Sequence, residues 1–559
     1  MYNENMIWIG GDSQHKVCIH PKMANRHGFI TGATGTGKTT TLRTMAESFS
    51  DCGVPVFLAD VKGDLAGMCT PGDPEGWVGK RIEEMGLAPE GFNFHSCPVT
   101  FWDVYAKNGL PLRTTVSEMG PLLMSRILGL NATQEAVLTC VFKIADDEGL
   151  LLIDTKDLRS MLKYAGENAK EYSATYGNMS PQSIAAIVRS VVALEANGGD
   201  QFFGEPALDI RDWITTDFNG KGMVNILDCQ ELFQSPIMYG TFLLWMLSEL
   251  YETLPEVGDL DKPRMVFFFD EAHLLFEDAS KALLSKVEQV VKLIRSKGVG
   301  IYFITQSPND IPGGVLAQLG NKVQHALRAY TPAEQKAVKA AAMSFRENPE
   351  FDTYETLQNL ATGEALVSVL DEKGIPTIAE RCIILPPQCG NATITDEERD
   401  MKIKQSNLYM KYSSFVDRDS AYEFLERKSI ADAEALEAQK LAAAEEKQRL
   451  KDEAAAEKAR EKEIAAAEKQ REREAIAAQK AAEKEALAAE KARIKEEEQK
   501  KKDKQKFVKS MASTTGTTVG REIGQTVGKA VAGDFGKKIG GNLGSAIGRG
   551  ILGGIFGKK

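Results

Sequence analysis

The sequence predicts an α/β fold with a mostly parallel central sheet, a helical insertion, a long C-terminal helix and a Gly-rich tail. Three observations support this prediction. A Gly-rich loop with the spacing G-x-x-x-x-G-K-[ST] occupies residues 32–39, between a short apolar run and a helix-compatible segment. Apolar runs that end in polar residues recur up to about residue 390, as expected of buried parallel strands. From about residue 431 the composition collapses to Ala, Glu, Lys, Arg and Gln, which are strong helix formers.

The Gly-rich loop has the spacing of a nucleotide-binding P-loop. Glycines let its backbone curl so that successive N–H groups face phosphate oxygens, and the helix that follows adds its N-terminal dipole. Lys38 is placed to reach the β- and γ-phosphates of ATP, and the Thr39 hydroxyl can bind Mg²⁺. A Gly-rich surface turn is the alternative interpretation. The predicted nucleotide-binding residues are Gly32, Ala33, Thr34, Gly35, Thr36, Gly37, Lys38, Thr39 and Thr40.

Acidic residues follow two of the predicted buried strands. The run Val54–Asp60 places Asp60 at the carboxyl end of its strand, where open α/β sheets bind ligands, although a loop Asp that caps the next turn is an equal alternative. The run Met265–Phe269 is followed by Asp270 and Glu271, as in a Walker B strand. In that reading Asp270 supports Mg²⁺ together with Thr39, and Glu271 polarises the attacking water.

Two further polar residues follow later strands. Gln306 comes directly after Val299–Thr305 and could sense the γ-phosphate, or simply begin a turn before Ser-Pro. The run Asn321–Arg328 reads as an edge strand that ends in Arg328, which could serve as an arginine finger toward a neighbouring subunit or as a surface ion-pair partner. A last strand is expected at Glu364–Leu370, after which residues 381–387 are expected to leave the core.

Composition shifts divide the chain into six segments. Helical patterns dominate between the early and late strands, in residues 70–220. This segment contains no recognisable catalytic or binding motif, so we interpret it as an insertion that acts mainly as scaffold. The predicted segments are 1–69 (first part of the ATPase core), 70–220 (helical insertion), 221–390 (rest of the core), 391–430 (connecting helical segment), 431–505 (charged helical arm) and 506–559 (basic glycine-zipper tail).

The arm and the tail differ sharply in character. Large apolar residues are sparse and irregular between Ala431 and Lys504, so a stable two-stranded coiled coil is not expected, and the segment reads as a spacer helix or a partly disordered linker. Beyond residue 515, glycine recurs at nearly every fourth position, and the segment from Phe507 onward carries eight basic and two acidic residues. Such a tail could lie on an anionic membrane or self-associate, with a flexible tail as the alternative.

The totals exclude several classes of protein. A net charge of −11 over 559 residues argues against a protein that coats nucleic acid over its whole surface, although a local basic channel remains compatible with it. The eight cysteines show no C-x-x-C pair and no zinc spacing, as expected of reduced thiols in the cytoplasm. The first residues lack the features of a secretion signal, and no run of 18 uncharged apolar residues predicts a membrane span.

The P-loop, the acidic residues after two strands, Gln306 and Arg328 follow one another along the chain. In this order they resemble the motifs of the HerA/FtsK branch of RecA-like motor ATPases, and in particular those of the bacterial helicase HerA-like group. The resemblance covers roughly residues 5–390 and is specific at residues 27–38, Phe269–His273 and Thr305–Pro308. It implies a RecA-like sheet, ATP and Mg²⁺ as ligands, and hexameric rings with active sites shared between neighbours. By the same resemblance Asp60 and Asp270 support the metal and the water, Glu271 is the base, Gln306 is the sensor and Arg328 is the finger in trans.

Two departures from the family pattern affect the functional prediction. HerA proteins carry an N-terminal β-barrel, whereas 31 residues precede Gly32 here, and the arm and the Gly-rich tail lie outside the usual plan. These departures weigh against DNA translocation but not against ATP binding and hydrolysis. The resemblance as a whole leads us to expect an ATP-hydrolysing ring motor that translocates or remodels DNA. The alternative is a membrane-tethered or self-assembling NTPase that acts on protein partners through its arm and tail, with peripheral membrane contact by the tail.

Overall fold

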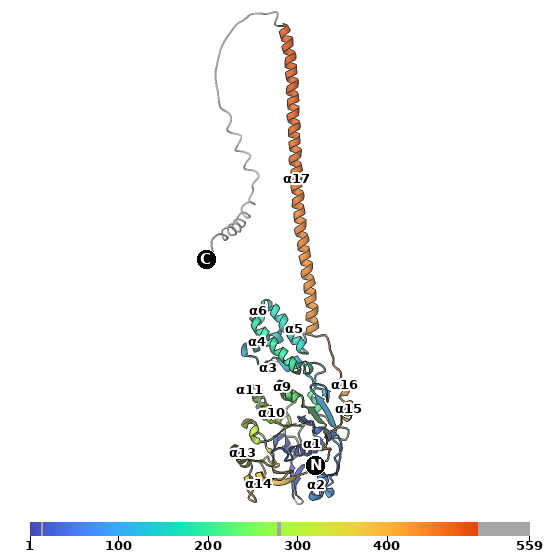
Figure 1. Ribbon diagram of the computed structural model, residues 1–559, viewed down its shortest axis with the longest axis vertical. Coiled ribbons are helices and arrows are strands. Elements are labelled where there is room, and N and C mark those ends of the chain that lie inside the picture. The colour runs from blue at the N-terminus through green and yellow to red at the C-terminus, as the bar shows by residue number, and fades with distance from the viewer. Residues whose placement is uncertain (13–14, 277–280, 501–559) are drawn as a thin grey trace. The chain divides into compact units, whose positions relative to one another are not determined.

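The structure, a computed structural model, describes residues 1–12, 15–276 and 281–500 (Figure 1). The chain forms two compact units, Met1–Lys440 and a second that begins at Leu441. The first unit contains the predicted sheet and its helices. The second contains most of the long C-terminal helix. The Gly-rich tail predicted at 506–559 lies outside the described residues.

Thirteen strands of the described residues form one sheet in the first unit. Its order is β1-β2-β13-β12-β11-β4-β10-β9-β5-β8-β6-β7, and β3 pairs with β2. All pairs from β11 to β7 in this order are parallel, whereas the pairs among β1, β2, β3, β13, β12 and β11 are antiparallel. The strands are β1 Tyr2–Asn3, β2 Met6–Gly11, β3 Lys16–Ile19, β4 Gly28–Thr31, β5 Val56–Asp60, β6 Val99–Asp103, β7 Leu110–Pro111, β8 Val224–Asp228, β9 Met265–Phe269, β10 Val299–Thr305, β11 Asn321–Gln324, β12 Glu364–Ser368 and β13 Glu380–Ile384.

The central strands are buried on both faces, which explains their nearly continuous apolar sequences. Every residue of β4, β5, β8, β9 and β10 is buried. Side chains alternate between two cores: Phe267 and Phe269 of β9 pack with Phe57 on one face, whereas Phe268 packs with Phe49 of the first helix on the other. The predicted α/β class with a mostly parallel sheet is therefore confirmed.

Helices cover both faces of this sheet. The helix after the P-loop packs on one face, and the helices near 236–253 and 281–293 pack on the other. The helices are α1 Lys38–Asp51, α2 Trp77–Met85, α3 Val116–Ile127, α4 Ala132–Glu148, α5 Thr155–Glu167, α6 Ala169–Tyr176, α7 Pro181–Leu194, α8 Asp200–Phe202, α9 Pro236–Thr253, α10 His273–Phe276, α11 Lys281–Leu293, α12 Gly313–Leu316, α13 Pro332–Met343, α14 Thr353–Asn359, α15 Asp396–Gln405, α16 Tyr409–Tyr412 and α17 Ala421–Lys500.

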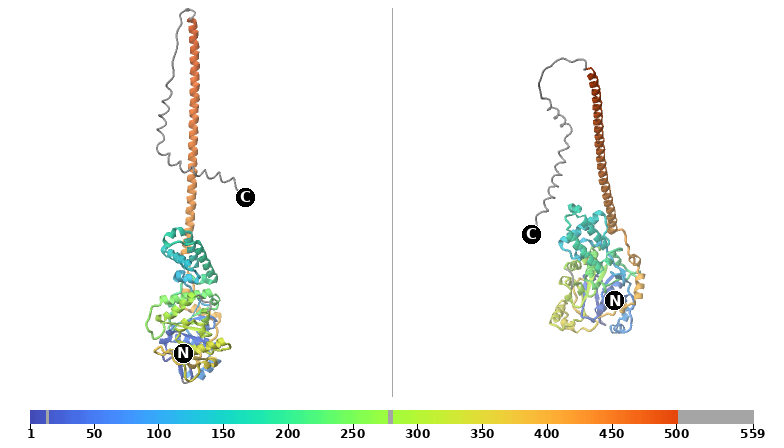
Figure 2. Two further views of the ribbon diagram at one scale, coloured as in Figure 1. Left: turned by 90° about the vertical axis from the view of Figure 1, so that its left-hand side faces the viewer. Right: turned by 45° about the horizontal axis from the view of Figure 1, so that its top comes forward.

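The segment 70–220 is only partly a separate helical layer. Its helices α4, α5 and α6 gather at one end of the first unit, well away from the N-terminus in two views (Figures 1 and 2). The same segment also supplies β6 and β7, which extend the sheet beyond β8. The segment therefore builds one edge of the core as well as an insertion. The six predicted boundaries themselves stay a prediction.

Two predictions about the late strands were wrong. The run predicted as an edge strand forms β11, which lies inside the sheet between β4 and β12 and stops at Gln324, four residues before Arg328. Residues 381–387 do not leave the core, because β13 pairs with β12 on one side and with β2 on the other. The N-terminal and C-terminal strands of the core thus meet in the sheet, a pairing that no local sequence pattern reveals.

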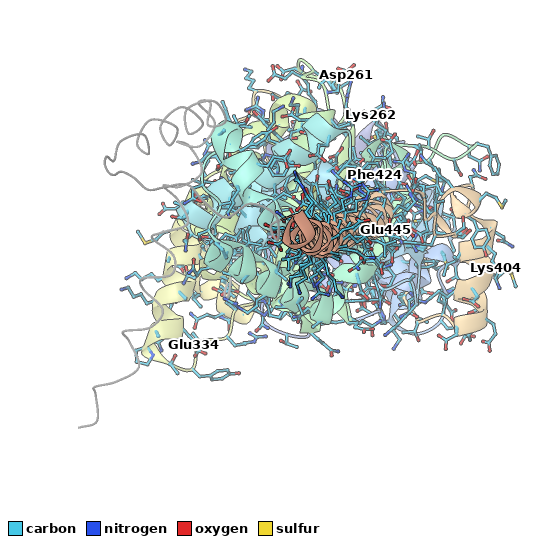
Figure 3. The ribbon with its side chains drawn as sticks, turned by 90° about the horizontal axis from the view of Figure 1, so that it is seen from above. Asp261, Lys262, Glu334, Lys404, Phe424 and Glu445 are labelled. Atoms are coloured by element: carbon cyan, nitrogen blue, oxygen red, sulfur yellow. The ribbon has the colours of Figure 1, made fainter. Side chains whose placement is uncertain are left out.

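The C-terminal arm is helical, as the sequence predicted. The helix α17 has 80 residues and would be about 120 Å long at 1.5 Å per residue. Seen along its axis it projects side chains on all sides, among them Glu445 (Figure 3). Its described side chains beyond Lys440 are all exposed. Within residues 1–12, 15–276 and 281–500, no helix is both long and apolar enough to cross a membrane.

Candidate functional site

The predicted P-loop joins the buried strand β4 to α1 at the carboxyl edge of the parallel strands. Gly35 (φ +77°) and Gly37 (φ +114°) adopt backbone conformations that side chains with a Cβ rarely take. A Cβ on Gly32 (φ +155°) would lie 2.5 Å from Cβ of His325, so this position has no room for a larger residue. The loop is anchored by hydrogen bonds from the N–H of Ala33 to the carbonyl of Ala326 (2.9 Å) and from the N–H of Gly363 to the carbonyl of Thr36 (2.9 Å).

Lys38 begins α1 and points back over the loop. Its Nζ donates hydrogen bonds to the carbonyl oxygens of Gly32 (2.7 Å) and Ala33 (3.2 Å). Burial lowers the pKa of Lys38, and the carboxylates of Glu271 and Asp270 oppose that shift. The ammonium group is therefore held beside the loop and near the acidic pair that follows β9.

Asp270 and Glu271 follow β9, which is separated from β4 by β10 alone. Burial, followed by the charge of Glu271, raises the pKa of Asp270 to about 6. The ammonium of Lys62, just past the end of β5, donates a hydrogen bond of 2.5 Å to Oε1 of Glu271. Burial alone would lower the pKa of Lys62, but the bond to Glu271 and the charges around it raise the pKa overall.

Glu271 is held in an unusual way. Its φ of +47° places a non-glycine residue in the left-handed region, a conformation that costs free energy and tends to persist at functional sites. Its second carboxylate oxygen, Oε2, is buried and accepts no hydrogen bond from the described residues, and it lies 3.4 Å from Nδ1 of His273. A buried carboxylate oxygen that lacks a hydrogen-bond partner is uncommon in folded proteins and marks this residue as one to explain by function.

Asp60 lies at the end of β5, as predicted, but its carboxylate is already engaged. One oxygen accepts from the N–H of Gly63 (2.7 Å) and the other from the N–H of Leu65 (3.0 Å). Burial, with the charge of Asp64 second, raises the pKa of Asp60 to about 7. This geometry corresponds to the capping interpretation. A catalytic role for Asp60 stays a prediction.

Two cavities meet at Thr34, and each is lined by some of the predicted residues, whereas Asp60, Asp270 and Glu271 line neither. The first, of about 390 Å³, is bounded on one side by the P-loop and the start of α1, with Lys62 beside them. The second, of about 860 Å³, contains Gln306, Arg328 and His273. The structure thus places Gln306 and Arg328 together, next to the P-loop but outside the first cavity. The guanidinium of Arg328 donates to the backbone carbonyls of Gln358 and Leu360 (3.2 Å to the latter).

The first cavity fits a magnesium–nucleotide complex. Its volume falls within the usual range for small-molecule sites. The curled Gly-rich backbone, the ammonium of Lys38 and the helix N-terminus supply positive potential for phosphates. Within the described residues no group of three or more His, Cys, Asp or Glu side chains could hold a metal alone. A Mg²⁺ here would use the Thr39 hydroxyl together with phosphate oxygens and water. Asp270, the other predicted ligand, does not line this cavity, and its role stays a prediction.

Sequence reasoning missed two residues at this site. Lys62 comes two residues after Asp60, the end of β5. At this strand end only Asp60 was predicted as a site residue. The place of Lys62 just beyond a strand at the sheet edge is the one sequence feature that indicates a role for it. His325 is fully buried beneath the P-loop, where Nε2 contacts Oγ1 of Thr41 (2.8 Å) and Nδ1 contacts the carbonyl of Glu364 (2.8 Å). Burial, with the charge of Lys38, lowers the pKa of His325 to about 4, so this histidine is a neutral structural support.

Comparison with known proteins relates the chain to helicases. The profile of the family described as "Helicase HerA-like C-terminal" matches residues 6–483. A probable helicase of Methanocaldococcus jannaschii is 30% identical over 154 residues, which cover 26% of this chain and 28% of that protein. The DNA double-strand break repair helicase HerA of Sulfurisphaera tokodaii is 23% identical over 381 residues, which cover 66% of this chain and 67% of that helicase.

Among solved structures, the bacterial conjugative coupling protein TrwB aligns with a TM-score of 0.44 and 15% sequence identity, covering 68% of this chain and 90% of that one. The helicases that match this chain in sequence are themselves covered over between about a quarter and two thirds of their length.

Proposed function

The chain belongs to the helicase HerA-like C-terminal family, and on that premise we propose that it is an ATP-hydrolysing motor of the HerA/FtsK kind that acts on DNA. The observation that carries the proposal is the meeting of two motifs from distant parts of the sequence. Glu271 follows β9, two strands away from the P-loop strand, and its ion-pair partner Lys62 lines the same cavity as Lys38. Glu271 does not itself line this cavity, but its bond to Lys62 brings its carboxylate next to the phosphate-binding loop, which supports a role in hydrolysis there.

Each side chain has a distinct task in this proposal. Lys38 and the loop N–H groups hold the β- and γ-phosphates. Thr39 and Asp270 would hold Mg²⁺, which would supply charge neutralisation on the phosphate oxygens. Glu271 orients the attacking water and takes its proton. Lys62 holds the other oxygen and so fixes the direction of the carboxylate.

The ring assembly belongs to the same proposal. The cavity that contains Gln306 and Arg328 adjoins the P-loop at Thr34, and Arg328 and Tyr330 are exposed there, with Tyr330 at 85%. We assign this face to contact with the next subunit of a hexamer, in which Arg328 would approach the neighbour's nucleotide. The alternative function, an NTPase tethered by its tail, depends on residues outside the described part of the chain.

DNA-stimulated hydrolysis tests the proposal. ATP hydrolysis is measured with and without double-stranded DNA, at two salt concentrations, for the full chain and for a chain that ends at Lys440. We expect DNA to raise the rate severalfold in both, and the stimulation to weaken with salt because phosphate contacts release counterions. An ATP hydrolysis rate that DNA does not change in either chain would contradict the proposed DNA motor. Sedimentation with anionic vesicles that requires the tail would then favour the tethered NTPase.

A further inference from the structure

The first cavity extends beyond the P-loop to the helix α2. On the side away from the phosphate-binding residues, its lining includes Trp77, Arg81 and Ile384. Trp77 begins α2 and Arg81 follows four residues later, so the two side chains lie on the same face of the helix. The helix is anchored beside this face, since Val78 and Met85 are buried. The helix therefore presents two large side chains to the cavity from a fixed position.

Trp77 is exposed, which is unusual for a side chain of its kind in this protein. Its exposed fraction is 45%, whereas Trp8, Trp102, Trp213 and Trp245 are at most 2% exposed. Tryptophan is a large residue that is usually well covered in folded proteins. An indole left open beside an apolar side chain in a concave site is typical of a surface that receives a flat ligand.

Arg81 fixes this surface to the frame of the P-loop. Its guanidinium donates long hydrogen bonds to the carbonyls of Gly363 (3.4 Å) and Ile384 (3.3 Å), at the ends of β12 and β13. Gly363 in turn donates its N–H to the carbonyl of Thr36 in the P-loop. A Cβ on Gly363 would lie 3.0 Å from the Arg81 guanidinium, so the absence of a side chain there leaves room for this contact. The α2 surface and the phosphate loop are thus parts of one connected structure.

We propose that Trp77 and Arg81 form the nucleoside subsite of this cavity, where the indole face of Trp77 stacks on a purine base while the phosphates lie at Lys38. The inference rests on the proposed function, because it assumes that a nucleoside triphosphate occupies the P-loop. Arg81 joins α2 to the rim of the cavity through the carbonyls of Gly363 and Ile384. Neither residue takes part in the hydrolysis itself.

The lining predicts which bases are accepted. On the α2 side, the lining residues among those described offer an aromatic face, the aliphatic Ile384 and a guanidinium, but no side-chain amide or carboxylate that could read the edge of one base. Stacking strength depends on the area of the base and tolerates its substituents. The site should therefore bind ATP and GTP within about threefold of each other.

Binding to the full-length protein tests the subsite with three probes: ATP, GTP and inorganic tripolyphosphate, which has no base. In Trp77→Ala we expect affinity for ATP and GTP to fall by about tenfold while affinity for tripolyphosphate stays unchanged. Trp77→Phe should keep ATP affinity within about threefold and lose the change in tryptophan fluorescence that ATP causes in the wild type. The matched control is Phe218→Ala, which removes a 97% exposed aromatic side chain outside the cavity and should change nothing.

The remaining outcomes separate the subsite from the proposed function. Unchanged ATP affinity in Trp77→Ala would overturn the subsite and leave the P-loop function intact. Equal losses for ATP and tripolyphosphate would also overturn it, because Trp77 would then act by supporting the loop. If the wild type bound none of the three probes, the proposed function would fail and the subsite with it. Lys38→Ala should lose all three probes.

Discussion

The ionised carboxylate of Asp270 is less favourable in the folded protein than in the unfolded chain. Its buried position at the end of β9, and then the charge of Glu271, raise its pKa from an ordinary 3.8 to about 6. Between these values the folded protein binds the proton more tightly than the unfolded chain does. The free energy of unfolding therefore falls as pH rises from about 3.8 to about 6, and the full cost is present above pH 6.

Removing this charge should stabilise the nucleotide-free protein. For Asp270→Asn we expect the free energy of unfolding at pH 8 to rise by about 2–3 kcal/mol, and by about half as much at pH 5. Urea unfolding at the two pH values measures the free energy of unfolding. The control is Asp261→Asn, at an exposed position, which should change this free energy little (Figure 3). An equal effect at both pH values, or a loss of stability at pH 8, would contradict the assigned burial cost. The same variant should lose Mg²⁺-dependent hydrolysis.

At this scale the sequence predicted some site residues but not others. The P-loop, Asp270 and Glu271 could be predicted because a fixed local spacing carries their chemistry. Lys62 could not, because its ion pair with Glu271 joins residues 209 positions apart and exists only because β5 lies next to β9. Trp77 gave no signal either, since an aromatic residue in a helical pattern normally indicates a buried face.

At the scale of elements, the most local patterns were predicted best. The central strands were found because burial on both faces leaves continuous apolar runs. The order of the strands in the sheet could not be predicted, and β11 was wrongly expected at an edge. Its interior place depends on β12, β13 and β2 closing the sheet on its far side, through antiparallel pairs between the two ends of the core. Pairing of that kind leaves no mark in either segment alone.

The start of α17 is fixed by one buried carboxylate. Asp157 in the first turn of α5 is 1% exposed and accepts hydrogen bonds from Oγ of Ser420 (2.6 Å) and the N–H of Tyr422 (2.8 Å). Its other oxygen accepts from the N–H groups of Ile153 (2.7 Å) and Asp154 (3.1 Å). One side chain thus caps α5 and attaches the first turn of α17 to it.

Loss of this carboxylate should loosen both helices. We expect Asp157→Ala to lower the free energy of unfolding of the first unit by about 2–4 kcal/mol, because several buried N–H donors lose their partner. Urea unfolding followed by tryptophan fluorescence measures the change. Asp146→Ala, on the exposed face of α4, is the matched control and should stay within about 0.5 kcal/mol of the wild type. If the two variants were equally stable, Asp157 would not hold this junction.

At the scale of the whole molecule, the proposed ring predicts complementation between inactive variants. Arg328→Ala has an intact Glu271, and Glu271→Gln has an intact Arg328, so a mixed ring contains some complete sites if Arg328 acts on the neighbour. Mixing equal amounts of the two should restore hydrolysis to about a quarter of the wild-type rate, the share of correct neighbours in a randomly mixed ring. Activity that never exceeds the sum of the separate variants would contradict a finger in trans and leave Arg328 as a support for the carbonyls of Gln358 and Leu360.

The central claim is that Glu271 orients the water that cleaves a triphosphate held at Lys38, and single-turnover hydrolysis of ATP by Glu271→Gln tests it most directly. Glutamine keeps the size and can still face Lys62, but it cannot take a proton. We predict that this variant binds ATP within about threefold of the wild type and cleaves it at least about 100-fold more slowly. Cleavage at the wild-type rate, with ATP bound normally, would contradict the claim.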